Sequence, residues 1–173
     1  MLKKILLTVT CVFCISKLAY SQSLSLDNLI NMQKTGMTGI NNTLLNKDWV
    51  FSGTNKISRS DDSCNFPELS WVFAPSSGNY GDAFVNLYKG DADCHNIVSY
   101  QTNSRNTYLN IKASLPQYGL VLKETKLVSN DSSQGIKEIY ASKKLVLESI
   151  VSSSKTTSGN LKNYYYYIIY FKL

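Results

Sequence analysis

The sequence predicts an α+β protein in which an antiparallel sheet of about eight strands carries its helices on one face. Three observations lead to this class. Apolar residues recur at helical spacing in two segments, residues 24–46 and 107–117. Each segment is followed by four stretches with the period-two alternation of half-buried strands. Polar, turn-rich linkers separate most of these stretches, as in antiparallel meanders.

Residues 1–21 are predicted to be a secretory signal peptide. Two lysines precede a mostly apolar run, and the small residues Ala19 and Ser21 predict cleavage before Gln22. The alternative is a retained membrane anchor, but the apolar run is too short to span a bilayer comfortably. We therefore expect an exported protein, periplasmic or extracellular, with a single α+β domain at residues 22–173 that is not inserted in a membrane.

Cleavage also changes the charge balance. The whole chain carries a net charge of +6, and the predicted signal peptide contains three lysines and no acidic residue, which leaves +3 on the mature chain. A charge of this size favours solubility but does not predict a nucleic-acid site. Lys143 and Lys144 form the only lysine pair in the mature chain. Nucleic acid is therefore not an expected partner.

In the first half, residues 24–46 are expected to form two short helices divided at Thr35 and Gly36, with Ser25 and Asp27 as capping residues. The period then changes from helical to alternating. The expected strands begin at Trp49 and continue at residues 68–74, 83–89 and 95–101.

In the second half, the helical spacing at residues 107–117 is again followed by alternation. The expected strands lie at residues 120–128, 136–141, 145–151 and 164–173, with linkers at 129–135 and 152–160.

The two halves align as a weak internal repeat with an offset of 71 residues. Val50 then matches Val121, and Thr54 matches Thr125. The predicted repeats are residues 22–102 and 103–173, each a helix-plus-four-strand unit; chance coincidence of apolar positions is the alternative.

This element order resembles the β-lactamase-inhibitor type of module, which occurs in secreted bacterial proteins. The resemblance covers most of the mature chain and rests on the order of elements, with no sequence signature. It implies tandem helix-plus-four-strand units whose free sheet face grips a protein partner.

Two cysteines, Cys64 and Cys94, remain after signal cleavage. In an oxidising compartment a disulfide between them is the expected state, and separate thiols are the alternative. The bond would close a loop of about thirty residues and stabilise the fold by roughly 3 kcal/mol. The two cysteines and the single histidine supply too few ligands for a metal site.

The last strand contains an unusual run of tyrosines. Alternation sends Tyr165 and Tyr167 to the same face as Leu173, which we assign to the core. Tyr164, Tyr166 and Tyr170 fall on the other face and are predicted to bind a partner, because tyrosine buries a large area while keeping a hydroxyl for hydrogen bonding. Ordinary cross-strand packing is the alternative interpretation.

This strand is also expected to be paired on both sides or protected by a partner, because a long strand of high β-propensity would aggregate at an exposed edge. Candidates to extend this aromatic surface are Trp71, Phe73, Phe84 and Tyr88, although alternation does not decide which of them point to solvent. Core packing is preferred for Trp49 and Trp71.

Catalysis is not expected. The single histidine, His95, follows Cys94 directly, and neighbouring strand residues point to opposite faces, so the two cannot form a nucleophilic pair. Asp61, Asp62 and Glu68 are the nearest approach to paired carboxylates, but they occupy a polar loop. No phosphate loop, zinc motif or nucleophile elbow is present, and no metal or cofactor is predicted.

The sequence therefore predicts a secreted or periplasmic, non-catalytic protein-binding module that uses an open sheet face. The alternative is a carrier of a small ligand or lipid, with an apolar cavity between the sheet and the helices. An enzyme is the third hypothesis. Neither the identity of the protein partner nor the oligomeric state follows from the residues.

Overall fold

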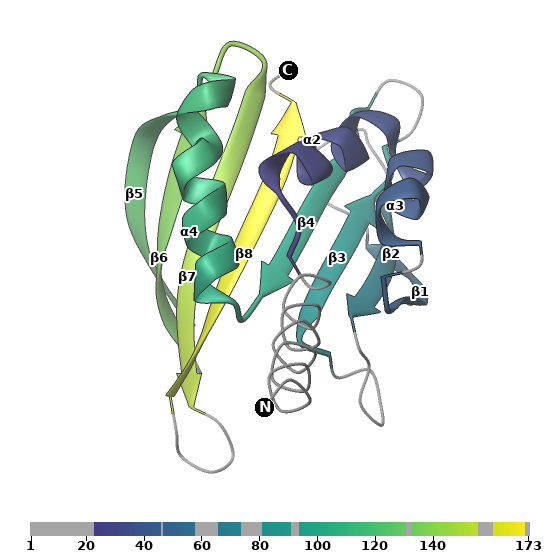
Figure 1. The fold of residues 1–173 in the computed structure, drawn as a ribbon. Helices are drawn as coiled ribbons and strands as arrows, with labels where there is room; N and C mark the ends of the chain where they lie inside the picture. The colour runs from purple at the N-terminus through teal and green to yellow at the C-terminus, as the bar shows by residue number, and fades with distance from the viewer. Residues whose placement is uncertain are drawn as a thin grey trace, which may run out of the picture.

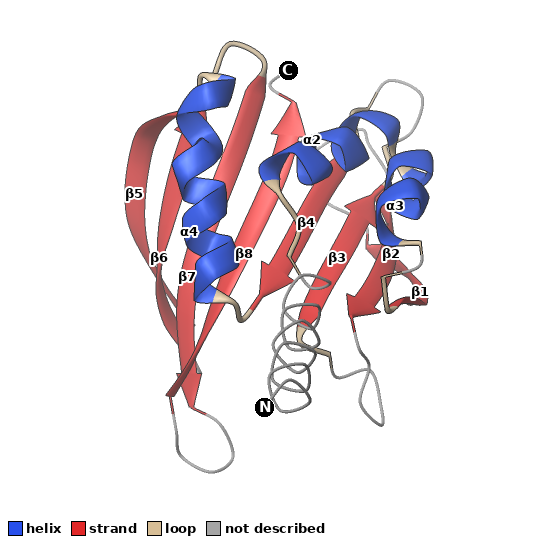
Figure 2. Cartoon of the chain, in the orientation of Figure 1, coloured by secondary structure: helices blue, strands red, loops and turns tan. Residues whose placement is uncertain are grey.

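The computed structural model describes residues 23–45, 47–57, 66–73, 81–90, 94–130, 133–155 and 161–171. The predicted signal peptide and Cys64 lie outside these residues. The described residues form an open antiparallel sheet with three α-helices in front of it (Figures 1 and 2). This confirms the predicted α+β class and the placement of the helices on one face.

The chain begins with two short helices separated at one glycine. Helix α2 (Leu26–Thr35) starts at Ser25, whose side chain accepts a hydrogen bond from the Asn28 N–H, while the Asn28 side chain accepts one from the Ser25 N–H. Gly36, with φ of 59°, ends α2 and begins α3 (Met37–Leu44). This φ lies in the left-handed region, which favours glycine, so the predicted division of the helical segment is confirmed.

Two four-stranded meanders share the sheet. The strand order is β1-β2-β3-β4-β8-β7-β6-β5, so the last strand of each meander lies at the centre and the first strand lies at an edge. The strand bounds are β1 (Trp49–Ile57), β2 (Phe66–Phe73), β3 (Ala83–Tyr88), β4 (Ile97–Thr102), β5 (Val121–Asn130), β6 (Ser133–Ala141), β7 (Leu145–Lys155) and β8 (Leu161–Phe171).

The C-terminal strand β8 pairs with β4 on one side and with β7 on the other. The prediction that this tyrosine-rich strand is paired on both sides is therefore confirmed. Its central position leaves none of the paired tyrosine backbone at a sheet edge, where it could template aggregation.

Between the meanders, helix α4 (Arg105–Ser114) and the 3₁₀ turn η1 (Leu115–Tyr118) precede β5. The Ser104 side chain caps α4 by accepting a hydrogen bond from the Thr107 N–H. Ile111 and Leu115 are buried, which places the apolar stripe of α4 against the sheet.

The hydrophobic core lies between the helices and one face of the sheet. Strands β3 and β8 show why: Val85 and Tyr167 point to the helices and are fully buried, whereas the alternate positions Phe84 and Tyr166 are only partly buried. The core residues with the least exposure come from both layers and include Leu29, Met32, Ile40, Leu87, Ile111 and Leu147.

Two local features recur 71 residues apart. Asp48 and Gly119 both have positive φ, 57° and 65°, just before β1 and β5. A β-bulge follows at the same offset, between Phe51 and Gly53 in β1 and between Leu122 and Glu124 in β5. This is the offset at which the apolar positions align, so the geometry supports the predicted duplication, which stays a prediction.

The structure differs from the sequence prediction at some strand ends. Strand β7 continues to Lys155 and so includes part of the segment 152–160 that was predicted as a linker. Strand β8 starts at Leu161, directly after that segment. The register pairs Ser152 with Tyr164 and Ser153 with Asn163. These serines lack an apolar alternation that could reveal a strand, and the backbone pairing with β8 extends it.

Candidate functional site

Alternation along β8 separates its tyrosines onto two faces. Tyr165 and Tyr167 lie in the core, with 7% and 0% of their surface exposed. Tyr164 and Tyr166 occupy the opposite face and are half-buried. The side chain of Tyr170 lies outside the described residues, although its backbone pairs with Val146. The predicted division of the strand is thus confirmed for the first four tyrosines.

We call the surface opposite the helices the open face. One row of directly paired residues crosses it through all eight strands, and the row contains Tyr166 at its centre. In strand order the row reads Val50, Val72, Phe84, Gln101, Tyr166, Ile150, Lys137 and Lys126. No charged residue enters this row until β6.

Charge is scarce over the centre of the open face. Among the described side chains that β3, β4, β8 and β7 present there, Glu148 is the only charged one. Its carboxylate forms an ion pair with Lys137 across the β6–β7 ladder at 2.6 Å. The same face also carries the partly buried apolar side chains of Phe84, Tyr88 and Ile150. A solvated sheet face ordinarily carries polar residues, so an uncharged, partly apolar face marks a candidate interaction surface.

The Tyr166 hydroxyl on this face is neutral at physiological pH. Burial raises the pKa of Tyr166, and the neighbouring Tyr164 raises it further. A neutral phenol both donates and accepts a hydrogen bond, and it is less costly to bury than a charge. A partner surface can therefore cover Tyr166 without desolvating an ion at that position.

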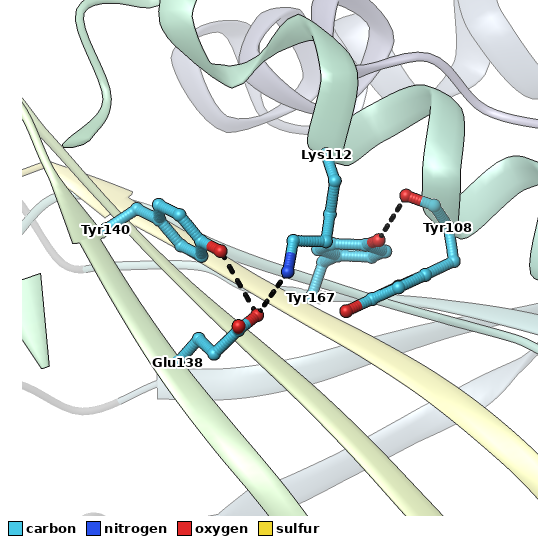
Figure 3. A network of polar contacts seen from close by, with 5 residues as sticks. All are labelled: Tyr108, Lys112, Glu138, Tyr140 and Tyr167. Carbon is cyan, nitrogen blue, oxygen red and sulfur yellow. Dashed lines mark hydrogen bonds and ion pairs between the residues drawn. The ribbon is translucent and has the colours of Figure 1, made fainter. Parts of the chain in front are cut away.

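A second arrangement, on the helix side, is a polar network between α4 and the sheet (Figure 3). The Lys112 ammonium lies 2.7 Å from Glu138 Oε2, and the Tyr140 hydroxyl donates to the same oxygen at 3.1 Å. The Tyr167 hydroxyl donates to the Tyr108 carbonyl at 3.0 Å. The Tyr108 ring stacks on Tyr165 with a centroid separation of 4.6 Å. These contacts connect the helix to β6 and β8.

The network stabilises the charged form of Lys112. Burial alone would lower the pKa of this lysine, but hydrogen bonding to Glu138 and the contacts with Tyr140 and Tyr108 outweigh burial and hold the pKa above its usual value. The ammonium also lies over the Tyr108 ring at 5.4 Å from the centroid. For the Tyr140 hydroxyl, in contrast, burial raises the pKa.

These protonation states favour a structural role for the network. A cationic Lys112 cannot act as a nucleophile or a base. The neutral Tyr140 hydroxyl already donates its proton in a hydrogen bond to Glu138. Ser149, which pairs with Glu138 across the ladder, is only 1% exposed, and no described group hydrogen-bonds its Oγ. A hydroxyl buried beneath α4 cannot meet a substrate. The network instead holds α4 on the sheet.

Glu138→Gln tests this role. We expect the free energy of unfolding to fall by about 1.5–3 kcal/mol, because the substitution leaves the partly buried Lys112 ammonium without its counter-ion. The measurement is urea denaturation followed by circular dichroism. Glu124→Gln is the matched control: its ion pair with Lys126 at 2.9 Å is about half exposed, so a change within about 0.5 kcal/mol is expected. Equal losses in both variants would contradict the role of the network.

The remaining sequence candidates are not gathered into a site. His95 lies exposed in the loop before β4, which begins at Ile97 and not at His95 as predicted. Asp61 and Asp62 lie outside the described residues, whereas Glu68 is buried on the open face and accepts a hydrogen bond from the Ser70 hydroxyl. Within the described part of the chain, no three His, Cys, Asp or Glu side chains are placed to hold a metal ion.

The disulfide between Cys64 and Cys94 stays a prediction, because Cys64 is outside the described residues.

Sequence reasoning missed Lys112 and Glu138, although both carried a signal. Lys112 falls next to Ile111 on the inner side of an amphipathic helix, and Glu138 alternates with Ile136 and Tyr140 on one face of β6. Two opposite charges at positions where the pattern expects apolar residues suggest an ion pair. Their partnership across 26 positions required the fold.

The fold and the open face define an α+β protein of one eight-stranded antiparallel sheet with a largely uncharged face opposite its helices. No protein-family model, no curated protein and no solved structure matches the chain. The resemblance to β-lactamase-inhibitor-type modules therefore stays a hypothesis about architecture. None of the helices in the described ranges has the length and apolar character needed to cross a membrane.

Proposed function

We propose that this chain is an exported, secreted or periplasmic, non-catalytic protein-binding module, and that its open face contacts the partner. The observation that carries the proposal is the uncharged row through Phe84, Gln101 and Tyr166, at the centre of a sheet whose described helices lie on the other side. Covering such a surface with a complementary apolar surface removes apolar area from water, which favours binding.

The tyrosines supply the anchors in this proposal. Tyr164 and Tyr166 are half-buried on the open face, and alternation along the sequence predicts the same face for Tyr170. Each ring buries a large area at low entropic cost, which is why tyrosine is common at the energetic centres of interfaces. Gln101, paired with Tyr166, adds a polar group that fixes orientation.

The first experiment isolates the partner. Protein from cells expressing the full-length chain with a C-terminal tag serves as bait against envelope and culture extracts, and mass spectrometry identifies what is retained. A variant with Tyr164, Tyr166 and Tyr170 replaced by Ala is expected to lose the partner while its melting temperature shows a folded domain. Leu109→Ala/Leu122→Ala/Leu127→Ala is the control, because these leucines are exposed, at 47%, 52% and 87%.

A single substitution then tests the same face with little change in shape. Gln101→Glu places a charge between Phe84 and Tyr166, and burying that charge against a partner should weaken the isolated complex by at least about tenfold. Gln134→Glu makes the same change on β6, at an exposed position on the helix side, and should leave the affinity within about twofold. If the triple tyrosine variant and Gln101→Glu both bound the partner as tightly as the wild type, the proposal would be overturned.

A further inference from the structure

A groove on the helix side lies between α2, η1 and the turn that joins β6 to β7. Its volume is about 550 Å³. Ile30, Leu145 and Tyr118 form its apolar surface, and Lys34, Lys143 and Lys144 line it with positive charge. Pockets for small molecules commonly have volumes of about 300–1,000 Å³, so the groove is large enough for a small ligand.

Hydrogen bonds hold the walls of the groove in place. The Tyr118 hydroxyl donates to the Asp27 carboxylate and ties η1 to the first turn of α2. This bond raises the pKa of Tyr118 to about 12, so the phenol remains a donor. In the β6–β7 turn, the Ser142 N–H donates to the Leu145 carbonyl at 2.9 Å, and the Leu145 N–H donates to Ser142 Oγ at 3.0 Å. The groove is therefore built on ordered backbone.

The charged residues that line the groove are all lysines. None of the three groove lysines forms an ion pair with a described residue, and none of the described residues that line the groove is acidic. Asp27, Ile30 and Lys34 share one stripe of α2, with Asp27 and Lys34 about 10 Å apart along the helix axis. The Tyr118 hydroxyl donates a hydrogen bond to Asp27, which lies at the opposite end of this stripe from Lys34. The groove thus combines an apolar surface with three lysine side chains.

We propose that this groove binds a small amphiphilic anion, an apolar chain or ring that carries a carboxylate or phosphate group. The anionic group lies among Lys34, Lys143 and Lys144, and the apolar part covers Ile30, Leu145 and Tyr118. Exposed lysines alone would hold an anion weakly, since solvent screens them, but burying apolar surface beside them adds favourable free energy. This site is separate from the open face and independent of the protein-binding proposal.

Isothermal titration calorimetry with four ligands of one chain length tests the site: octanoate, octyl phosphate, octanol and octyltrimethylammonium, each below its micelle concentration. The protein is isolated from cells that express the full-length chain. We expect binding of one or both anions, weaker binding of octanol and none of the cation. Lys34→Gln/Lys143→Gln/Lys144→Gln should reduce anion affinity by at least about tenfold, because it removes all three positive charges that line the groove.

Lys47→Gln/Lys89→Gln/Lys123→Gln is the matched control, because these three lysines are also exposed and lie outside the groove. Its affinity should stay within about twofold of the wild type. Bound octanoate should also protect Lys143 and Lys144 from acetylation, read by mass spectrometry. The relative affinities of the two anions identify the preferred head group. No anion binding, equal binding of the cation, or equal losses in both triple variants would overturn the proposal.

Discussion

Tyr167→Ala is expected to lower the free energy of unfolding by about 3–5 kcal/mol, the usual cost of deleting a buried aromatic ring. Tyr167 is fully buried and stacks against Tyr100 at a centroid separation of 6.5 Å. Its hydroxyl donates to the Tyr108 carbonyl, so the variant loses both packing and a hydrogen bond. Urea denaturation followed by circular dichroism measures the loss.

The neighbouring residue provides the control for this prediction. Tyr166→Ala removes the same atoms one position earlier in β8, but from the half-buried open face. We expect it to cost about 1 kcal/mol, because the truncated site opens to solvent and leaves no closed cavity. If the two variants were equally destabilised, the assignment of the two faces of β8 would be wrong.

Alkaline pH is expected to destabilise the fold through its buried tyrosines. Burial raises the pKa of Tyr100 from 10 to about 12, although hydrogen bonds with Thr102 and the Leu24 backbone lower it in part. Burial raises the pKa of Tyr167 as well. Between pH 10 and 12 the unfolded chain therefore binds fewer protons than the folded one, and stability falls as pH rises.

The magnitude follows from the pKa difference. A change from 10 to about 12 corresponds to about 3 kcal/mol from Tyr100 alone, present below pH 10 and lost by pH 12. Urea unfolding at pH 7, 9 and 11 measures the decline. Tyr100→Phe removes the titrating hydroxyl, so its stability should fall less steeply above pH 10. Parallel curves for the wild type and the variant would contradict the assignment.

The secondary structure was largely predictable because its signals are local. The division of the first helical segment needed only Gly36, and the two faces of β8 needed only alternation through Tyr164, Tyr165, Tyr166 and Tyr167. Strand ends were less predictable where the residues are polar. Ser152 and Ser153 lack an apolar pattern, and their backbone joins the ladder because β8 is alongside.

The polar network and the groove were not predictable, because each joins residues that are distant in the chain. Lys112 and Glu138 come from α4 and β6, and the groove joins Ile30, Tyr118 and Leu145 from three separate segments. Local periodicity assigns a side chain to a face but does not state which element covers that face. Only docking of the helices on the sheet brings these groups together.

The amino-acid sequence by itself determined the element types, their order and the two faces of the last strand, because helix and strand periods depend only on neighbouring residues. The tertiary structure decided that β4 and β8 meet at the centre of one sheet, so that Gln101 lies beside Tyr166. That contact joins residues 65 positions apart, and its register depends on how the two meanders pair, which no local pattern specifies.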